Sequence, residues 1–403
     1  MSVIFRKGLD ARQDVADALA RDYHSQLVDE IKAAGFRARS GRLTVHLARE
    51  FGFCYGVDRA VDYAYQTRHK FPSRTVYLTG EIIHNPHVNA RLRAAGLRFL
   101  TDAGESIDRL GPDDVVILPA FGVAVADLER LEQRGCILVD TTCGSVLNVW
   151  KNVRQYAQDG FTALIHGKVH HEETRATASQ ALRFPNGTFL IILDGQEAEL
   201  VCTYIRRRGD RAAFLARFAA AASPGFDPDR DLARIGLANQ TTMLMSESLA
   251  IGDMVRRAMI DRYGERDLAH HYVAFDTICS ATQDRQDAVE QLLATHPFDL
   301  MLVIGGYNSS NTRNLARICA RRARTYHIAD ASCLVSPAEL RHQPIDAPVT
   351  FQMPAQALRY SELTVTGWLP AAGPLSVGLT AGASTPDNIV GQVIERLEEF
   401  TKS

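Results

Sequence analysis

The chain has 403 residues, of which 46% are hydrophobic and 23% charged, and its formal net charge is −2. These values fit a protein of two or three domains with a sizeable core, and they exclude the broad basic surface that nucleic acids or anionic membranes attract. No apolar run approaches the ~20 residues of a membrane helix, and the N-terminal segment lacks the apolar core of a signal peptide. We therefore expect a cytoplasmic protein. Its seven cysteines, an odd number, suit thiols or metal ligands better than a disulfide framework.

Short apolar runs alternate with amphipathic segments along most of the chain, a pattern that predicts a parallel α/β architecture. Residues 1–42 are expected to form a mostly helical extension before the first strand. Helices are predicted in PHVNARLRAAG and VAVADLERLEQRG, each closed by a glycine. The predicted strands are 75–78, 115–118, 137–139, 163–165, 189–193, 300–304 and 375–380. After the extension, we divide the chain into three α/β units at 43–135, 136–271 and 272–403.

Three cysteines share one sequence context. VDTTCGSV, with Cys143, and FDTICSAT, with Cys279, both follow an apolar run and precede an amphipathic helix. LTVHLAREFGFCYGV lacks the Asp-Thr pair but places Cys54 in the same way. Because functional groups gather at the carboxyl ends of parallel strands, three such units around an axis would bring three thiols to one point.

Three gathered thiols at helix N-termini favour a metal, because that position promotes the thiolate form. Three protein ligands leave one coordination position open, as catalytic sites do. Zinc with a bound water would indicate hydrolysis or deamination, whereas an iron–sulfur cluster would indicate reduction or dehydration. No CxxC pair supports a zinc ribbon, and the remaining possibility is that these cysteines are small buried hydrophobes. We interpret the other four cysteines as structural: Cys136, Cys202, Cys319 and Cys333.

Three loops between an apolar run and a helix carry small polar residues. They are GGYNSSN after residue 304, TAGASTPD with Ser384, and NQTTM with Thr241 and Thr242. Hydroxyl, amide and backbone donors at a helix N-terminus can hold a phosphate, although simple helix capping explains each loop alone equally well. Together they favour a phosphorylated ligand. The P-loop and dinucleotide fingerprints are absent from the sequence.

Histidines add acid–base chemistry to this set. EIIHNP places His84 before a predicted helix, and HGKVHHEET places His171 two residues from Glu173. A histidine and a carboxylate so placed could bind an anion and deliver a proton. A zinc protease motif is excluded, because Arg175 stands where HExxH would need its second histidine.

These stretches resemble the LytB family, the 4-hydroxy-3-methylbut-2-enyl diphosphate reductases of isoprenoid biosynthesis. The resemblance covers most of residues 43–390 in family order, and its wording is closest to the plant and cyanobacterial branch. The matching stretches are GFCYGVDRA, EIIHNP, VDTTC, HGKVHHEETRATAS, NQTTM, DTICSATQDRQDAV, GGYNSSNT and GLTAGASTPD.

The resemblance implies a trefoil of three pseudo-threefold-related α/β units around a central 4Fe–4S cluster, with a helical N-terminal extension. Cys54, Cys143 and Cys279 match the cluster ligands. The implied activity removes the substrate's hydroxyl as water with two electrons and two protons, giving isopentenyl and dimethylallyl diphosphate. This is the last step of the methylerythritol phosphate pathway.

Further roles are carried over residue by residue. Glu173 matches the proton relay and Thr241 the hydroxyl beside the departing oxygen. The residues that match substrate-binding positions are His84, His171, Ser309, Ser310, Asn311 and Ser384. The sequence has no flavin or nicotinamide fingerprint, so the resemblance implies an external electron donor such as ferredoxin or flavodoxin. The basic runs YIRRRGDR and CARRARTYH could face an acidic donor, but solvated surface is the simpler interpretation.

Two positions depart from the family pattern. Phe121 stands where many bacterial members have a second histidine for the diphosphate, and Gly144 stands where proline is usual. Phenylalanine also occurs in the plant-like branch, and a helix can begin without proline, so we expect small effects. The competing interpretations are another open-cluster enzyme (a hydro-lyase or a quinolinate synthase-like enzyme), a zinc hydrolase, and an iron–sulfur sensor that binds a partner.

Overall fold

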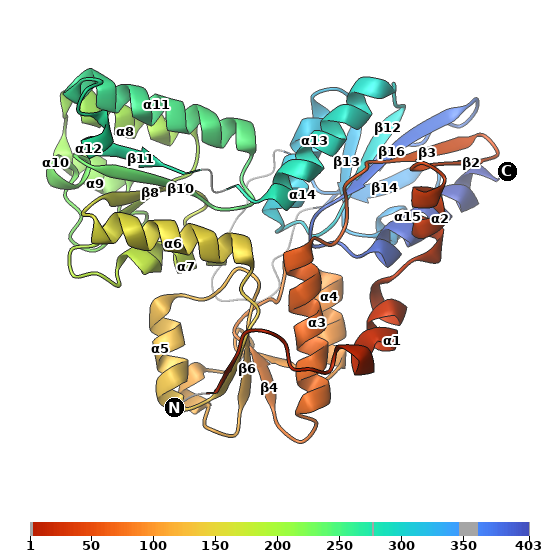
Figure 1. The fold of residues 1–403 in the computed structure, drawn as a ribbon. Helices are drawn as coiled ribbons and strands as arrows, with labels where there is room; N and C mark the ends of the chain where they lie inside the picture. Colours follow the sequence, from red (N-terminus) through yellow and green to blue (C-terminus); the bar gives the residue numbers. More distant parts are fainter. Residues whose placement is uncertain (1–2, 276–277, 346–361, 403) are drawn as a thin grey trace. The chain divides into compact units, whose positions relative to one another are not determined.

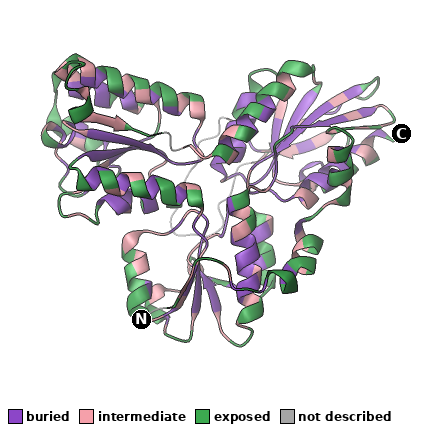
Figure 2. Ribbon diagram, in the orientation of Figure 1, coloured by how far each residue is buried: buried purple, intermediate pink, exposed green. Residues whose placement is uncertain are grey.

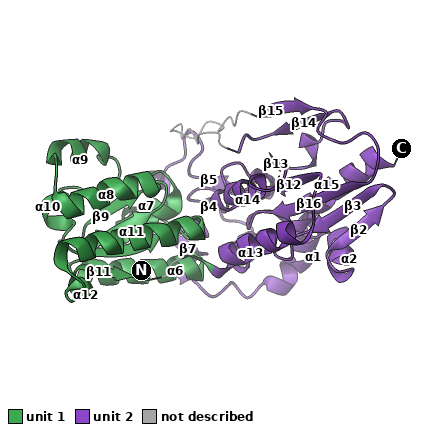
Figure 3. Ribbon diagram, turned by 90° about the horizontal axis from the view of Figure 1, so that it is seen from above, with its two compact units in different colours: residues 1–2, 121–136, 142–279 green, residues 3–120, 137–141, 280–403 purple. Residues whose placement is uncertain are grey.

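The computed structural model describes residues 3–275, 278–345 and 362–402, and the chain divides into two compact units (Figure 3). Unit 1 comprises residues 1–2, 121–136 and 142–279, and unit 2 comprises residues 3–120, 137–141 and 280–403. Each unit is a separate α/β body with its own buried core. In both, the central strands are buried, whereas edge strands such as β2 and the outward sides of the helices are exposed (Figure 2).

Unit 1 contains one parallel sheet with the strand order β11-β10-β8-β9. The strands are β8 (Thr162–His166), β9 (Phe189–Ile192), β10 (Ile235–Asn239) and β11 (Tyr272–Ala274). Helices α6 (Gly144–Gln158) and α7 (Glu172–Ala181) cover one face of this sheet, and α8 (Gly195–Arg207) and α11 (Met245–Tyr263) cover the other (Figure 1). The unit also contains α5 (Val125–Arg134), α9 (Arg211–Arg217), α10 (Pro228–Asp231) and α12 (Leu268–His271).

Unit 2 contains two larger sheets, the first of which is parallel with the order β1-β7-β6-β4-β5. Its strands are β1 (Ile4–Phe5), β4 (Val76–Leu78), β5 (Arg98–Phe99), β6 (Val115–Leu118) and β7 (Ile137–Asp140). Apolar side chains of α3 (Tyr55–Lys70) and α4 (Pro86–Ala94) share a core with these strands, and α1 (Arg12–Tyr23) packs on α3. A short 3-10 helix lies at Ile107–Arg109.

The second sheet of unit 2 has the order β13-β12-β16-β3-β2, and only β2 runs antiparallel to its neighbour. Its strands are β2 (Arg37–Ser40), β3 (Leu43–Leu47), β12 (Leu300–Ile304), β13 (Thr325–Ile328) and β16 (Leu375–Ala381). Helices α13 (Ser280–Thr295) and α14 (Ser310–Ala320) lie on one face, and α2 (Gln26–Ala33) and α15 (Asp387–Thr401) on the other (Figure 1). A 3-10 helix (Ala331–Cys333) and the antiparallel pair β14 (Glu339–His342) and β15 (Leu363–Thr366) complete the unit.

All seven predicted strands are present, with bounds that differ by two residues at most, and both predicted helices are confirmed. Gly135 follows α5 in the left-handed conformation (φ 75°), which is why glycine closes that helix. Helices α1 (12 residues) and α2 (8 residues) make up about half of the predicted extension, which also contains β1 and β2 and is therefore less helical than the sequence suggested. β1 has only two residues and β2 reads RARS, so neither shows an apolar strand pattern.

β3 pairs with β16, so the strand before Cys54 belongs to the same sheet as the C-terminal strands. The three consecutive units at 43–135, 136–271 and 272–403, and their arrangement around a common axis, remain predictions. Within the described residues, no helix is long and apolar enough to cross a membrane.

Candidate active site

Each of the three cysteines with the shared context lies at the start of a helix, as predicted. Cys54 and Cys143 are the N-cap residues of α3 and α6, both with extended backbone, and Cys279 immediately precedes α13. All three are partly exposed. A helix N-terminus stabilises negative charge, so these positions suit thiolates that bind a metal.

The other four cysteines are buried, as expected for structural residues. Cys136, Cys202 and Cys319 have no exposed surface, and Cys333 has 1%. Burial raises the pKa of both Cys202 and Cys319 to about 12, because the thiolate loses its hydration in an apolar surrounding. Such groups remain neutral thiols at physiological pH and do not compete as metal ligands. All seven cysteines are described, and none forms a disulfide.

In unit 2, the loop before Cys54 is fastened to the loop that follows β16. The Cys54 N–H donates to the Ala383 carbonyl (3.2 Å) and the Gly52 N–H to that of Ala381 (3.3 Å). Gly52 has φ 75°, and a Cβ there would lie 2.8 Å from a carboxylate oxygen of Asp387. Only glycine fits this turn, so the backbone path into Cys54 is fixed by sequence and packing together.

In unit 1, Cys143 packs against a small cluster formed by Val146, Trp150 and Ala176. The Trp150 Nε1–H donates to Thr177 Oγ1 (3.1 Å), which anchors α6 on α7. A Cβ at Gly144 would meet no atom within 4 Å. Gly144 is exposed and faces open space, so a side chain at this position would add no packing contact through its Cβ.

Glu173, Thr241, His171 and Cys279 are brought together in unit 1 at the carboxyl end of its sheet. The Thr241 N–H donates to Glu173 Oε1 (2.5 Å), and the Cys279 N–H lies 3.4 Å from the Thr241 carbonyl oxygen. The Glu173 N–H donates to His171 Nδ1 (3.2 Å), so a neutral His171 carries its proton on Nε2. Glu173 is 2% exposed, and His171 and Thr241 are each 4% exposed. A buried carboxylate held by a backbone donor is suited to proton transfer.

Phe121 lies beside this group. Its ring meets the His171 ring edge-on, with centroids 6.1 Å apart and an angle of 75° between the planes. Phe121, one of the two departures from the family pattern, therefore contacts a predicted substrate-binding histidine directly. An aromatic ring supplies packing there in place of a second polar donor.

Sequence reasoning missed Gln240, which organises the same loops. Its side chain has no exposed surface, and its Oε1 accepts from the Lys168 N–H and the Thr174 hydroxyl (both 3.1 Å). Its Nε2 donates to Thr242 Oγ1 (2.8 Å). Gln240 thus ties the loop after β8 to the loop after β10. The sequence feature that could have indicated Gln240 is its position next to Thr241 at the end of a predicted apolar segment.

In unit 2, the loops that carry His84 and Ser384 meet. The Ser384 hydroxyl donates to the His84 carbonyl (3.2 Å), and Asn85 Nδ2 donates to the Ser384 carbonyl (2.8 Å). His84 Nδ1 lies 2.9 Å from Glu81 Oε2, which also accepts from Asn308 Nδ2 (2.8 Å). Glu81 orients the imidazole and was not predicted from the sequence.

The GGYNSSN loop joins the same cluster. Asn311 Oδ1 accepts from the Ala383 N–H (2.9 Å), which links this loop to the one with Ser384. A Cβ at Gly306 would lie 2.4 Å from the His84 carbonyl oxygen, so the loop approaches as closely as only glycine allows. Ser309 caps α14 by accepting from the Thr312 N–H (3.3 Å), and Ser310 is the first residue of that helix.

Asn311 also carries a buried donor that the fold leaves unused. Its side chain is 2% exposed, and its Nδ2 finds no acceptor among the residues that the structure describes. An unsatisfied buried donor costs about 1–3 kcal/mol, a cost that an anionic ligand would remove. Together with the N-terminus of α14, this donor makes the loop cluster a fitting site for a phosphate group.

The fold and these two groups of residues define an α/β protein with partly exposed thiols at helix starts and anion-binding loops. The family model described as LytB protein matches residues 45–398. The chain therefore belongs to the LytB family, and the resemblance seen in the sequence is confirmed.

Curated relatives agree with this assignment over almost the full length. A protein of Gloeobacter violaceus, named 4-hydroxy-3-methylbut-2-enyl diphosphate reductase, is 48% identical over 98% of this chain and 92% of its own. A protein of Thermosynechococcus vestitus with the same name is 47% identical, over 97% of this chain and 93% of its own. Both are cyanobacterial, in agreement with the branch that the sequence motifs resemble.

Solved structures share the fold. A structure of (E)-4-hydroxy-3-methyl-but-2-enyl diphosphate reductase, described as the terminal enzyme of the non-mevalonate pathway, covers 88% of this chain and 99% of its own. Its TM-score is 0.52 and its identity 26%. The Plasmodium falciparum reductase, at 19% identity and a TM-score of 0.59, covers 87% of this chain and 86% of its own. The α/β fold class is confirmed.

Proposed function

We propose that this chain reduces 4-hydroxy-3-methylbut-2-enyl diphosphate to isopentenyl and dimethylallyl diphosphate, the last step of the methylerythritol phosphate pathway. The observation that carries the proposal is the division of the cysteines. The three that match the family motifs are partly exposed at helix starts, and the other four are buried. The near-full-length identity to relatives that bear the reductase name supports the same conclusion.

A 4Fe–4S cluster fits the donor set of this chain. Cys54, Cys143 and Cys279 would hold it, and three thiolates leave one of four irons without a protein ligand. When bound, the cluster supplies the electrons and a Lewis-acidic iron for the departing hydroxyl. A zinc site with the same three thiols would instead support hydrolysis, so metal analysis separates the two.

The loop cluster of unit 2 would bind the diphosphate. His84, Ser309, Ser310, Asn311 and Ser384 offer imidazole, hydroxyl and amide donors, and the α14 N-terminus adds its partial positive charge. Binding at these groups orients the alcohol at the other end of a short substrate, and orientation alone lowers a barrier considerably. His171 in unit 1 is assigned to the same substrate.

Glu173 is assigned to proton transfer. The overall reaction takes up two electrons and two protons, breaks one C–O bond, forms one C–H bond and releases water. The Thr241 N–H fixes Oε1 of Glu173, and Oε2 is the atom that we assign to holding and delivering the proton. The Thr241 hydroxyl would hydrogen-bond the departing oxygen, which stabilises it as it leaves.

An external one-electron donor, a ferredoxin or flavodoxin, would supply the electrons. The basic run YIRRRGDR gives little support to a docking site for an acidic donor, because three of its four arginines contact acids of this chain. Arg206 contacts Glu199 and Asp261, Arg208 contacts Asp229, and Arg211 contacts Asp227. The interpretation of this run as solvated surface is the better supported one.

Iron, sulfide and zinc content of anaerobically purified protein tests the proposal. The unaltered chain is expected to carry about four irons and four sulfides. Cys143→Ala should lose them, whereas Cys202→Ala, a matched change at a buried cysteine of the same unit, should retain them. Zinc without sulfide would overturn the reductase assignment and favour a hydrolase.

An assay of the loaded protein with the diphosphate alcohol and reduced viologen completes the test. Formation of both isoprenoid diphosphates is the expected result. A loaded chain that consumes no substrate under these conditions would point to the sensor alternative instead.

A further inference from the structure

Arg285 occupies an unusual position in unit 2. It lies in α13, the helix that begins one residue after Cys279, and its side chain is 4% exposed. The guanidinium donates to the Gly52 carbonyl through Nε (3.2 Å) and Nη2 (2.7 Å), and to the Phe53 carbonyl through Nη2 (3.2 Å). Those two carbonyls immediately precede Cys54. Nη1 returns to the Ala281 carbonyl in the first turn of α13 (2.8 Å).

Within the part of the chain that the structure describes, no acid pairs with the charge of this buried arginine. Among the described residues, all acceptors of Arg285 are carbonyl oxygens, and no carboxylate lies within ion-pair distance. Burial of a cation without a counter-charge is costly, so such a residue is retained where an anion comes close. Asp387, whose carboxylate lies beside Gly52, is already paired with Lys32 at 2.6 Å.

The hydrogen bonds of Arg285 also connect two segments that are distant in sequence. One segment leads into Cys54, and the other begins directly after Cys279. Gly52 is held on its other side by the Ala381 carbonyl and by its contact with Asp387. The backbone approaching Cys54 is therefore clamped between the loop after β16 and a full positive charge.

We propose that Arg285 is a positioning residue for the iron–sulfur cluster. It fixes the backbone of the Cys54 loop against the start of α13, and its charge offsets the negative charge of the thiolate ligands. This inference rests on the proposed function, because it requires the cluster. Groups that orient metal ligands typically change metal affinity 10- to 100-fold when they are removed.

Three variants test the assignment. Arg285→Met removes the charge and the hydrogen bonds, and Arg285→Lys keeps the charge but loses the planar fork. Arg42→Met is the matched control. Arg42 immediately precedes β3 and, like Arg285, donates to two carbonyls that are distant in sequence, those of Pro370 and Gly373. For each protein, three quantities are measured: the rate of iron loss to a chelator, the cluster's midpoint potential, and the unfolding temperature of the cluster-free chain.

Arg285→Met is expected to lose iron about 10- to 100-fold faster than the unaltered chain. Its midpoint potential should fall, since removal of a nearby cation disfavours the more negative reduced cluster. Arg285→Lys should lose iron faster than the unaltered chain while it retains the potential. Arg42→Met should change neither quantity.

A structural role alone would lower the unfolding temperature of the cluster-free chain and leave the potential unmoved, and that result would overturn the inference. If Arg285→Met does not fold, Arg285→Lys decides, and an unchanged rate of iron loss in it would contradict the proposal. Failure of the proposed function is distinguishable, because the unaltered chain would then contain no iron and sulfide.

Discussion

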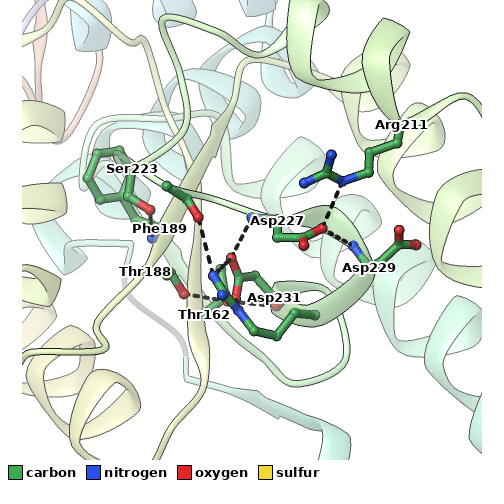
Figure 4. A network of polar contacts seen from close by, with 10 residues as sticks. Thr162, Thr188, Phe189, Arg211, Ser223, Asp227, Asp229 and Asp231 are labelled. Atoms are coloured by element: carbon green, nitrogen blue, oxygen red, sulfur yellow. Dashed lines mark hydrogen bonds and ion pairs between the residues drawn. The ribbon is translucent and has the colours of Figure 1, made fainter.

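The two ends of the sheet in unit 1 are both polar, but they use their polar groups differently. At the carboxyl end, Glu173, His171 and Thr241 are almost completely buried, and backbone N–H groups link them: Thr241 donates to the Glu173 carboxylate, and Glu173 donates to the His171 ring. At the amino end, Asp227 contacts Arg211 at 3.1 Å and Asp231 contacts Arg230 at 2.6 Å, with the arginine side chains more than half exposed (Figure 4).

This difference indicates that the two ends of the sheet serve different purposes, the carboxyl end catalysis and the amino end stability. An exposed ion pair contributes little, since water screens it and two long side chains lose freedom. A buried carboxylate held by a backbone donor is costly to place and is fixed in direction, as proton transfer requires. The amino end is therefore expected to affect folding without affecting catalysis, and the carboxyl end the reverse.

Glu173→Gln should have the largest effect. Loss of the transferable proton is expected to reduce kcat by about 10²- to 10⁴-fold, with iron and sulfide content unchanged. Steady-state rates and metal analysis on the same preparation check this. The control is Glu197→Gln, because Glu197 also accepts a backbone N–H, that of Leu193 at 2.7 Å, in the first turn of a helix. A near-normal rate in Glu173→Gln would contradict the assignment of Glu173 to proton transfer.

Asp231→Ala should affect stability instead. Asp231 accepts from the Asp227 N–H at 2.7 Å, and its carbonyl receives the Thr162 hydroxyl at 2.6 Å. Loss of the carboxylate leaves the Asp227 amide without its acceptor, which should cost about 1–3 kcal/mol in denaturant unfolding. The catalytic rate of the folded protein should not change. Asp229→Ala, at a more exposed acid of the same loop, should cost less; a reduced kcat in Asp231→Ala would contradict the comparison.

Asp227→Asn should have the smallest effect, and one that depends on pH. The Arg211 guanidinium, together with the Asp229 N–H, lowers the pKa of Asp227 below its usual value. A lowered pKa contributes stability that is present above the unfolded value, about pH 4, and is lost as the pH falls through the folded value. The stability difference between the unaltered chain and Asp227→Asn should therefore be present at neutral pH and shrink below pH ~4. Unfolding at a series of pH values measures it, and a pH-independent difference would show that the charge is not its source.

The sequence predicted what depends on local pattern. Apolar runs gave the seven strands, and the position of each cysteine between a strand and an amphipathic segment gave its place at a helix start. It could not give contacts between distant segments. The bonds from Arg285 to the Gly52 carbonyl and from the Lys168 N–H to Gln240 depend on how loops meet in three dimensions, and neither arginine nor glutamine marks such a contact by itself.

The edge strands show the same limit. β2 is polar, and its side chains are exposed on alternate residues because successive side chains of a strand point to opposite faces of the sheet. Without an apolar face, its sequence resembles a loop. The membership of β3 in the C-terminal sheet follows from its pairing with β16, which no local pattern encodes.

The two short strands of the N-terminal segment have a consequence for aggregation. β1 covers the outer edge of β7, and β2 covers the outer edge of β3, so the first 40 residues close one edge of each of the two larger sheets in unit 2. A shortened chain that lacked them would present the unpaired backbone of β7 (ILVD) and β3 (LTVHL), both mostly apolar, to other molecules. Open edges of this kind recruit strands from neighbouring chains. The segment thus protects the folded protein from self-association as well as adding to its core.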